Sequence, residues 1–304
     1  MNKIVIIGNS FAGHSCCQAL LKHPSTNEIT VISQEGSLPY KRNLLIEYLA
    51  DHFKENELFL REPDFYKKNN IRFLSNSKVA RLDTKKQSVV LKDNQRINFD
   101  YLVIASGQKV NIPDIPGNTK DGIFSVYTLE DAKKIKDKLM LTDTVCVSGD
   151  SDLCLRFWEA FVYKGKHIKI ISSPKQEIPV SAENTEWIDE FKILEFIGEG
   201  SELKALKLNN GKVIGAPLVL FLGNYIPCAD FLKESAIERA GDFIVVDDSM
   251  RTNFENIFAC GSIAKLKNNP DKQKSWEEIA DEGVRAAENL IHLLERGKTP
   301  CQMF

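Results

Sequence analysis

Residues 3–20 carry glycines at a spacing that could hold a phosphate group. An apolar run, 4–7, is followed at once by Gly8 and Gly13, and a second apolar stretch, 12–21, comes next. Gly8 can make the tight turn that ends a strand, and Gly13 lets the following helix pack close to that strand. The N-terminus of such a helix offers free N–H groups and the positive end of the helix dipole. The segment therefore predicts a site for the pyrophosphate of a dinucleotide.

The glycine pattern is incomplete, because Ser10 stands where G-x-G-x-x-G has its middle glycine. The next strand is predicted over 28–33, and a group that binds the ribose is expected about 20 residues past the glycines. That place reads Ser33-Gln34-Glu35, so Glu35 is the carboxylate at hand.

Length and composition limit the classes of protein that fit. The chain has 304 residues, 43% of them hydrophobic, and a net charge of −2, which suggests about two domains with sizeable cores. There is no basic stripe, so nucleic acid is not expected as a partner. No apolar run reaches about 18 residues, so no membrane span is expected. Met1 leads straight into the first strand, which leaves no signal peptide and makes a cytoplasmic protein the expectation.

The cysteines do not form a recognisable site. The chain has 7 of them, namely Cys16, Cys17, Cys146, Cys154, Cys228, Cys260 and Cys301. Their spacing fits neither zinc nor an iron–sulfur cluster, so no metal site is predicted. Structural disulfides are not expected in a reducing compartment. The adjacent pair Cys16–Cys17 is interpreted as two small residues that pack a helix, with a redox pair as the alternative.

A strand–helix–strand unit with an inserted set of short strands occurs twice. Residues 71–101 predict a small antiparallel meander, a buried strand follows at 101–105, and Pro113 and Pro116 mark a linker. Later elements are expected at 128–139 (helix), 144–147 (strand), 152–165 (helix), 167–171 (strand), 192–222 (antiparallel strands), 217–223, 243–252 and 256–262 (strands) and 275–295 (helix). We therefore expect an α/β protein with two Rossmann-like dinucleotide-binding domains, the second inserted in the first. The expected boundaries are 1–115 plus 243–304 for the first domain and 116–242 for the second.

Six segments in one order resemble the pyridine nucleotide-disulfide oxidoreductase superfamily, and within it the rubredoxin reductases and the flavin module of nitrite reductases. The segments are IVIIGNSFAG, ITVISQE-x3-PYKRNLL, FDYLVIASGQKVNIPDIPG, GIFSVYTLEDA, VDDSMRTNFENIFACGS and SWEEIADEGVRAAENL. They cover most of residues 3–130 and 243–292. The resemblance implies an FAD-dependent oxidoreductase with a first domain for FAD and a second for NAD(P)H.

The resemblance also implies roles for individual residues. The positions matched to FAD binding are Gly8, Ser10, Phe11, Ala12 and Gly13 (pyrophosphate), Gln34 or Glu35 (ribose), Arg42 (beside the flavin), Ala105, Ser106 and Gly107 (a turn that passes the cofactor), Gly261 and Ser262 (a Gly-Asp pair), and Glu282 and Gly283 (a helix N-terminus at the flavin). Ser262 replaces the aspartate of the Gly-Asp pair, which puts that contact in doubt. The resemblance implies no residue as a catalytic acid or base, and His14 is interpreted as structural.

The second glycine pattern departs from the family. Ser148, Asp150 and Leu153 stand where three glycines are expected. A carboxylate at Asp150 would repel a pyrophosphate by roughly 1 kcal/mol at ~4 Å in water, and by more when desolvated. As an alternative, Asp150 and Asp152 would cap the helix that begins near Leu153. Leu155 stands where the family has a glutamate facing the flavin. The residues 172–175 offer neither the acid expected for NAD nor the arginines expected for NADP, so ordinary NAD(P)H binding is not expected.

Two functions remain open. The first is flavin-mediated electron transfer between a reductant, either NAD(P)H or a redox protein, and an unknown acceptor. The alternative is a catalytically degenerate FAD-binding or electron-relay subunit of a larger redox complex that does not use NAD(P)H. The loop region directly after Tyr40 carries no cysteine, which argues against the family's usual redox disulfide, and the missing C-x-x-C argues against a thioredoxin-reductase-like enzyme. The family's C-terminal interface domain is also expected to be missing, so the family's usual dimer is not expected, and an oligomer of another kind or a complex stays open.

Overall fold

The computed structural model describes residues 1–23, 27–176, 183–268 and 274–296. The chain forms two compact units. Unit 1 comprises Met1–Lys41, Phe59–Gln108 and Pro227–Phe304, and unit 2 comprises Arg42–Leu58 and Lys109–Ile226. The boundaries expected from the sequence differ in three places, because residues 42–58 and 109–115 belong to unit 2 and the segment 227–242 belongs to unit 1.

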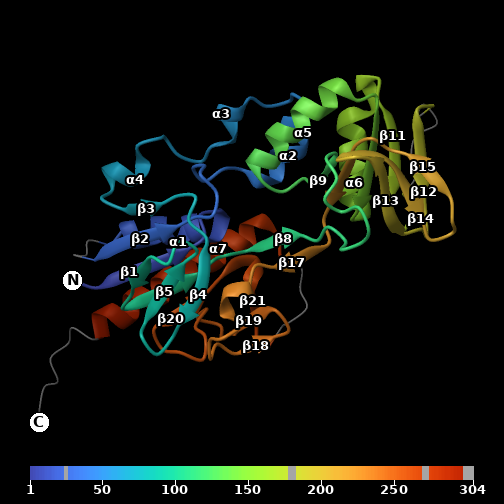
Figure 1. The fold of residues 1–304 in the computed structure, drawn as a ribbon. Helices are drawn as coiled ribbons and strands as arrows, with labels where there is room; N and C mark the ends of the chain where they lie inside the picture. The colour runs from blue at the N-terminus through green and yellow to red at the C-terminus, as the bar shows by residue number, and fades with distance from the viewer. Residues whose placement is uncertain (24–26, 177–182, 269–273, 297–304) are drawn as a thin grey trace, which may run out of the picture. The chain divides into compact units, whose positions relative to one another are not determined.

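Unit 1 is built on a parallel sheet of five strands in the order β20-β7-β1-β2-β3 (Figure 1). Its strands are β1 (Lys3–Ile7), β2 (Glu28–Ile32), β3 (Arg72–Leu74), β7 (Tyr101–Ile104) and β20 (Ile257–Ala259). The central strands β1 and β7 are apolar and buried from their second residue onward, as parallel strands covered on both faces require. Helices α1 (Phe11–Leu21) and α7 (Trp276–Arg296) pack against each other in this unit. The carboxyl ends of all five strands meet at one edge, where ligands bind in such sheets.

The antiparallel insertion in unit 1 is smaller than expected. It contains β4 (Val79–Asp83), β5 (Ser88–Leu91) and β6 (Arg96–Asn98). The prediction was wrong for residues 71–74, because β3 pairs in parallel with β2 and extends the main sheet. The remaining elements of unit 1 are α4 (Phe65–Lys68), η3 (Asp230–Leu232), β18 (Arg239–Ala240), β19 (Phe243–Val246), η4 (Gly261–Ile263) and β21 (Ala264–Leu266).

Unit 2 repeats the same plan. Its parallel sheet has the order β12-β11-β10-β16-β9, and a three-stranded antiparallel sheet is inserted before β16. The strands are β9 (Ile123–Ser125), β10 (Thr144–Gly149), β11 (His167–Ile171), β12 (Thr185–Ile188), β13 (Ile193–Glu199), β14 (Glu202–Leu208), β15 (Val213–Gly215) and β16 (Val219–Leu222). The helices are η1 (Arg42–Leu44), α2 (Leu45–Leu49), α3 (Glu55–Leu58), α5 (Leu129–Leu141), α6 (Ser151–Phe161) and η2 (Val162–Lys164). Two short strands, β8 (Gln108–Val110) and β17 (Tyr225–Pro227), pair with each other.

The two parallel sheets, each with its inserted antiparallel sheet, confirm the expected α/β class. Most predicted elements lie within two residues of their positions, although the strand expected over 243–252 ends at Val246. Within the ranges that the structure describes, no helix combines the length and the hydropathy needed to cross a bilayer.

Candidate functional site

The turn between β1 and α1 leaves no room for side chains at its two glycines. Gly8 has φ +110°, and a Cβ added to it would lie 2.0 Å from the carbonyl oxygen of Ala105. A Cβ on Gly13 would lie 2.1 Å from the carbonyl oxygen of Gly8. Real atoms do not approach so closely, so both positions require glycine. The roles predicted for these glycines, a tight turn and a close helix, are therefore confirmed.

The N-terminus of α1 is open to an acceptor. Ser10 is its N-cap residue, but the Ser10 side chain makes no capping hydrogen bond, and the first turn contains no acidic residue. Nearby, the Asn9 amide nitrogen Nδ2 is buried without a hydrogen-bond partner among the described residues, while Oδ1 of the same side chain accepts from the Tyr66 hydroxyl. Free N–H donors at a helix N-terminus form an anion site. Ser10, Phe11 and Ala12 thus lie where an anion could accept backbone hydrogen bonds.

Two segments of unit 1, the η4 turn and helix α7, converge on Ala12. A Cβ on Gly261 would lie 2.8 Å from the Ala12 Cβ, and a Cβ on Gly283 would lie 2.1 Å from the Ala12 carbonyl oxygen. The two glycines therefore allow the η4 turn and helix α7 to approach the first turn of α1. Ser262, the second residue of η4, is half-buried at this place.

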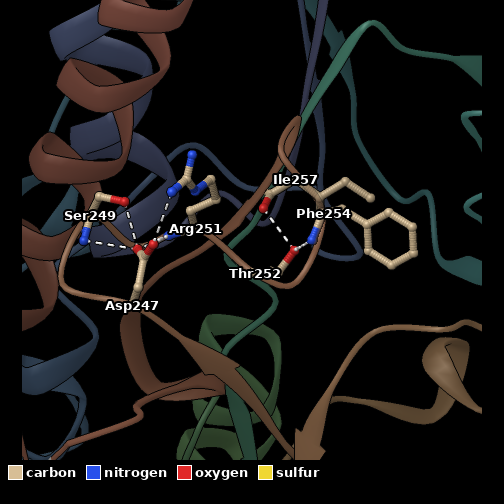
Figure 2. Close-up of polar contacts among 6 residues, drawn as sticks. All are labelled: Asp247, Ser249, Arg251, Thr252, Phe254 and Ile257. Carbon is tan, nitrogen blue, oxygen red and sulfur yellow. Dashed lines mark hydrogen bonds and ion pairs between the residues drawn. The ribbon is translucent and has the colours of Figure 1, made fainter.

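A loop that follows β19 supports the strand leading to Gly261 (Figure 2). Asp247 Oδ1 accepts hydrogen bonds from the backbone N–H groups of Ser249 and Arg251, at 2.9 and 3.0 Å. Burial raises the pKa of Asp247, but the hydrogen bonds from Ser249 and Arg251 outweigh it, and the net pKa is below the ordinary value. Thr252 Oγ1 donates to the Ile257 carbonyl and accepts from the Phe254 N–H. Residues 247–254 of the matched segment thus form a hydrogen-bonded loop between β19 and β20, and the strand expected over 243–252 ends before this loop.

Glu282 is placed differently from the prediction. Helix α7 begins at Trp276, so Glu282 and Gly283 lie inside the helix and not at its N-terminus. Glu282 is 6% exposed, and its Oε2 accepts from the Gly261 N–H at 2.8 Å. Lys274 Nζ lies 2.8 Å from the same carboxylate. The sequence pattern did not single out Lys274, because a lysine before a helix resembles any surface cation.

The residues predicted for the ribose lie at the end of β2. Glu35 is half-buried, and its Oε2 accepts from the Tyr40 hydroxyl at 2.6 Å, whereas Gln34 is exposed. The Ser33 hydroxyl donates to the Glu35 carbonyl at 2.9 Å. These contacts hold the Glu35 carboxylate near the end of β2, at the same sheet edge as the turn 8–13.

Ala105, Ser106 and Gly107 follow β7 at that edge. Ala105 is buried, and its N–H donates to the Ile7 carbonyl at 2.8 Å. The Ser106 hydroxyl donates to the Cys228 carbonyl at 3.0 Å, and the Cys228 N–H donates to the Gly107 carbonyl at 3.0 Å. The turn is thereby fixed by the segment that returns to unit 1.

Arg42 is the one predicted site residue in unit 2. Its Nη1 donates to the Tyr127 carbonyl, and its guanidinium carbon lies 4.3 Å from the centre of the Tyr127 ring. The Tyr127 and Tyr225 rings are 5.6 Å apart. The structure thus gives Arg42 a packed aromatic environment, and a role beside a flavin stays a prediction.

His14 and the two helix cysteines are buried. His14 is 3% exposed, and burial, with the Arg61 guanidinium, lowers its pKa to about 4. Burial raises the pKa of Cys17 to about 12 and the pKa of Cys16 well above its ordinary value. Both thiols are therefore protonated and free of disulfides, which favours the packing interpretation. Cys301 lies outside the described residues.

The second glycine turn has a different register from the one predicted. Gly149 has φ +141°, and a Cβ on it would lie 1.8 Å from the Leu222 carbonyl oxygen at the end of β16. Gly8 has the same relation to Ala105 at the end of β7. Gly149 therefore matches Gly8, and the prediction that all three glycines are lost was wrong. In the corrected register, Ser151 matches Ser10 and Cys154 matches Gly13.

The N-terminus of α6 is closed by a side chain. Asp150 is its N-cap residue, and Asp150 Oδ1 accepts from the backbone N–H groups of Asp152 and Leu153, both at 3.1 Å. The expected capping role is confirmed for Asp150. A carboxylate thus occupies the N–H groups that a pyrophosphate would use, in contrast to the open N-terminus of α1.

The corrected register also moves a flavin-facing position. The residue two places after the third glycine position is Arg156, not Leu155. Arg156 Nε donates to Glu47 Oε1 at 2.6 Å, and Arg156 Nη2 donates to the Asn43 carbonyl. A cation therefore stands where the resemblance implies a glutamate, and it is bonded within unit 2.

In the described ranges, no group of three or more His, Cys, Asp or Glu residues could hold a metal ion.

Residues 2–286, which are most of the chain, match the family described as pyridine nucleotide-disulphide oxidoreductase. The chain belongs to this pyridine nucleotide-disulphide oxidoreductase family. The family, the α/β fold and the oxidoreductase class predicted from the sequence are thereby confirmed.

Relatives in the family include electron-transfer enzymes. The chain is 29% identical over 270 residues to the NADH-rubredoxin oxidoreductase of Clostridium acetobutylicum, covering 87% of this chain and 68% of that protein. It is 26% identical over 280 residues to the rubredoxin-NAD(+) reductase of Pseudomonas putida, covering 87% and 72%. The putidaredoxin reductase of a covalent putidaredoxin reductase–putidaredoxin complex has the same fold, with a TM-score of 0.83 and 21% identity over 99% of this chain and 77% of that one.

Proposed function

We propose that this oxidoreductase binds FAD in unit 1 and uses it to pass electrons to or from a small redox protein. The observation that carries the proposal is the open N-terminus of α1, which has two obligatory glycines and no capping side chain. The relatives named for rubredoxin support a redox protein as the partner class.

The residues of unit 1 fit the cofactor. The N–H groups of the first turn of α1 and the unpartnered Asn9 amide supply donors for a diphosphate. Gly261 and Gly283 let the η4 turn and helix α7 pack closely against Ala12 in the first turn of α1. Glu35 and Gln34 stand at the end of β2, where a ribose binds in such sheets. Ser106, Gly107 and Ser262 line the same edge as further candidates. When bound, FAD would supply the redox chemistry, and the protein would bind and orient it.

For the electron donor, we propose that unit 2 does not bind NAD(P)H in the ordinary way. The Asp150 carboxylate holds the N–H groups at the N-terminus of α6, and Cys154 replaces the third glycine. The charge of the Asp150 carboxylate repels a pyrophosphate. The volume of Cys154 opposes the close packing of helix against strand that the third glycine of the pattern allows. Because the named relatives use NADH, the same site with a weakened affinity is the competing hypothesis.

An anaerobic titration separates these hypotheses. The protein reconstituted with FAD would be titrated with NADH and, separately, with NADPH, while the visible absorbance of the flavin is followed. We expect no bleaching at stoichiometric nucleotide and full bleaching with dithionite. Bleaching by one equivalent of either nucleotide would contradict the proposal for unit 2. If Asp150 is the cause, Asp150→Gly would gain bleaching by NADH, with Asp152→Gly as the matched control.

The second candidate function is an electron-relay subunit of a larger complex. It is favoured by Arg156, which stands at a flavin-facing position of the family and is bonded within unit 2 instead. A purified chain that binds FAD yet is reduced only in the presence of further subunits would support this candidate.

A further inference from the structure

A buried ion pair lies beside the turn that approaches Ala12. The side chains of Lys274 and Glu282 are 16% and 8% exposed, and Lys274 Nζ lies 2.8 Å from the Glu282 carboxylate. Lys274 Nζ also donates to the carbonyls of Gly261 and Ala264, at 3.0 and 2.7 Å. The carboxylate in turn accepts from the Gly261 N–H at 2.8 Å.

These bonds hold both ends of η4. Gly261 is bonded through its N–H and through its carbonyl, and Ala264 through its carbonyl, so the turn between them cannot shift without breaking several charge-assisted bonds. A Cβ on Gly261 would lie 2.8 Å from the Ala12 Cβ, so the position of this turn sets the space beside the first turn of α1.

We propose that Lys274 and Glu282 are positioning residues, which fix the turn Gly261–Ile263 against the N-terminus of α1 and thereby set the affinity and the reduction potential of the bound flavin. The inference rests on the proposed FAD site. It replaces the direct contact with the cofactor that the sequence implied for Glu282, because that carboxylate is already bonded to Gly261 and Lys274.

Removing the charge of Lys274 and removing the charge of Glu282 should have opposite effects on the flavin potential. A buried ion pair is costly to break, because the remaining charge has no partner. Lys274→Met leaves a negative charge beside an anionic cofactor, and Glu282→Gln leaves a positive one. Reduced flavin carries additional negative charge, so the first variant should lower its potential and the second should raise it. The double variant, Lys274→Met with Glu282→Gln, leaves neither charge.

The test measures FAD affinity and flavin midpoint potential of the full chain for the two single variants and the double variant. Glu288→Gln, on the exposed face of the same helix, is the control. We expect FAD affinity to fall by roughly tenfold or more in Lys274→Met. The two single variants should shift the potential in opposite directions, and the double variant should lie between them.

The inference is overturned if all variants keep the affinity and the potential of the unchanged protein, or if both single variants shift the potential in the same direction. Circular dichroism of each variant without FAD identifies a folding defect, and for a single variant that does not fold, Lys274→Gln or Glu282→Met, which also removes the charge, replaces it with the same expected sign. If the unchanged protein does not bind FAD, the proposed function fails instead, so the two failures are distinguishable.

Discussion

The Asp150 carboxylate accepts a hydrogen bond from the backbone N–H of Leu153 at 3.1 Å, and so closes the N-terminus of helix α6 in unit 2. The equivalent helix of unit 1 begins at Ser10 without any such acceptor. One fold thus contains an open and a closed version of the same turn. In the corrected register Asp150 matches Asn9, whose Oδ1 accepts from the Tyr66 hydroxyl and not from the first turn of α1.

Closing the open turn should remove FAD binding. Ser10 is the N-cap residue of α1, so in Ser10→Asp the new carboxylate would accept from backbone N–H groups of the first turn, and it would repel the pyrophosphate. We expect a loss of FAD affinity of about tenfold or more, with unchanged or higher stability of the protein without FAD. The measurement is a fluorescence titration with FAD and a urea unfolding curve. Thr128→Asp places the same charge at the N-cap of α5 and should leave FAD binding unchanged; equal loss in both variants would refute the specific role of Ser10.

Removing the cap of α6 should destabilise unit 2. Asp150→Ala deletes an acceptor of two backbone N–H groups, and a lost N-cap costs about 1 kcal/mol of unfolding free energy. Asp150→Asn should keep most of that stability, because asparagine is also a good N-cap residue. Urea unfolding followed by circular dichroism measures both. An alanine variant as stable as the unchanged protein would show that the cap contributes nothing.

A methyl group at Gly13 should disrupt the turn. The added Cβ would lie 2.1 Å from the Gly8 carbonyl oxygen, so α1 would have to move away from the strand. We expect Gly13→Ala to lose FAD binding and to lower the unfolding free energy by about 2 kcal/mol or more. Gly215→Ala is the matched control, since a Cβ there meets no atom within 4 Å. The account is wrong on this point if the two variants have the same FAD affinity.

His14 should make the protein less stable in mild acid. Its pKa is lowered to about 4, so the folded state holds the neutral ring while the unfolded state takes up a proton below about 6.5. The contribution of the neutral His14 to the free energy of unfolding is fully present above pH 6.5. It is lost as the pH falls toward 4, and the loss amounts to roughly 3 kcal/mol at most. His14→Phe keeps a ring beside Phe65 and should abolish that part of the pH dependence. Unfolding curves between pH 4 and 7 test this, with exposed His23→Gln as the control that should keep the slope.

The sequence predicted the parts of the fold that follow local patterns. The apolar strand before Gly8 and the helix expected over 128–139 could both be predicted from the local sequence. The resemblance to the family implied the site residues, and the structure places the segments 8–13, 34–35, 105–107 and 261–262 after β1, β2, β7 and β20. Their role in binding FAD stays a prediction. The register at 148–153 was wrong because the sequence alone allows either Ser148 or Gly149 to be aligned with the first glycine of the pattern. The close approach of Gly149 to the Leu222 carbonyl shows that Gly149 is the first glycine.

Long-range pairing could not be predicted. Residues 72–74 resemble a meander strand in isolation, and their pairing with β2 depends on the whole sheet. The bonds of Lys274 to Glu282 and to the η4 turn likewise depend on how α7 packs, since a helix position alone does not show a partner. Residues 42–58 belong to unit 2 because they pack against α5 and α6, and their composition alone does not show this.

The most direct test of the central claim is the flavin content of the purified protein after incubation with excess FAD and removal of the free cofactor. The account predicts a flavin absorbance spectrum with one FAD per chain, and its loss in Ser10→Asp. A folded protein that retains no flavin under these conditions would contradict the claim that the open N-terminus of α1 is an FAD site.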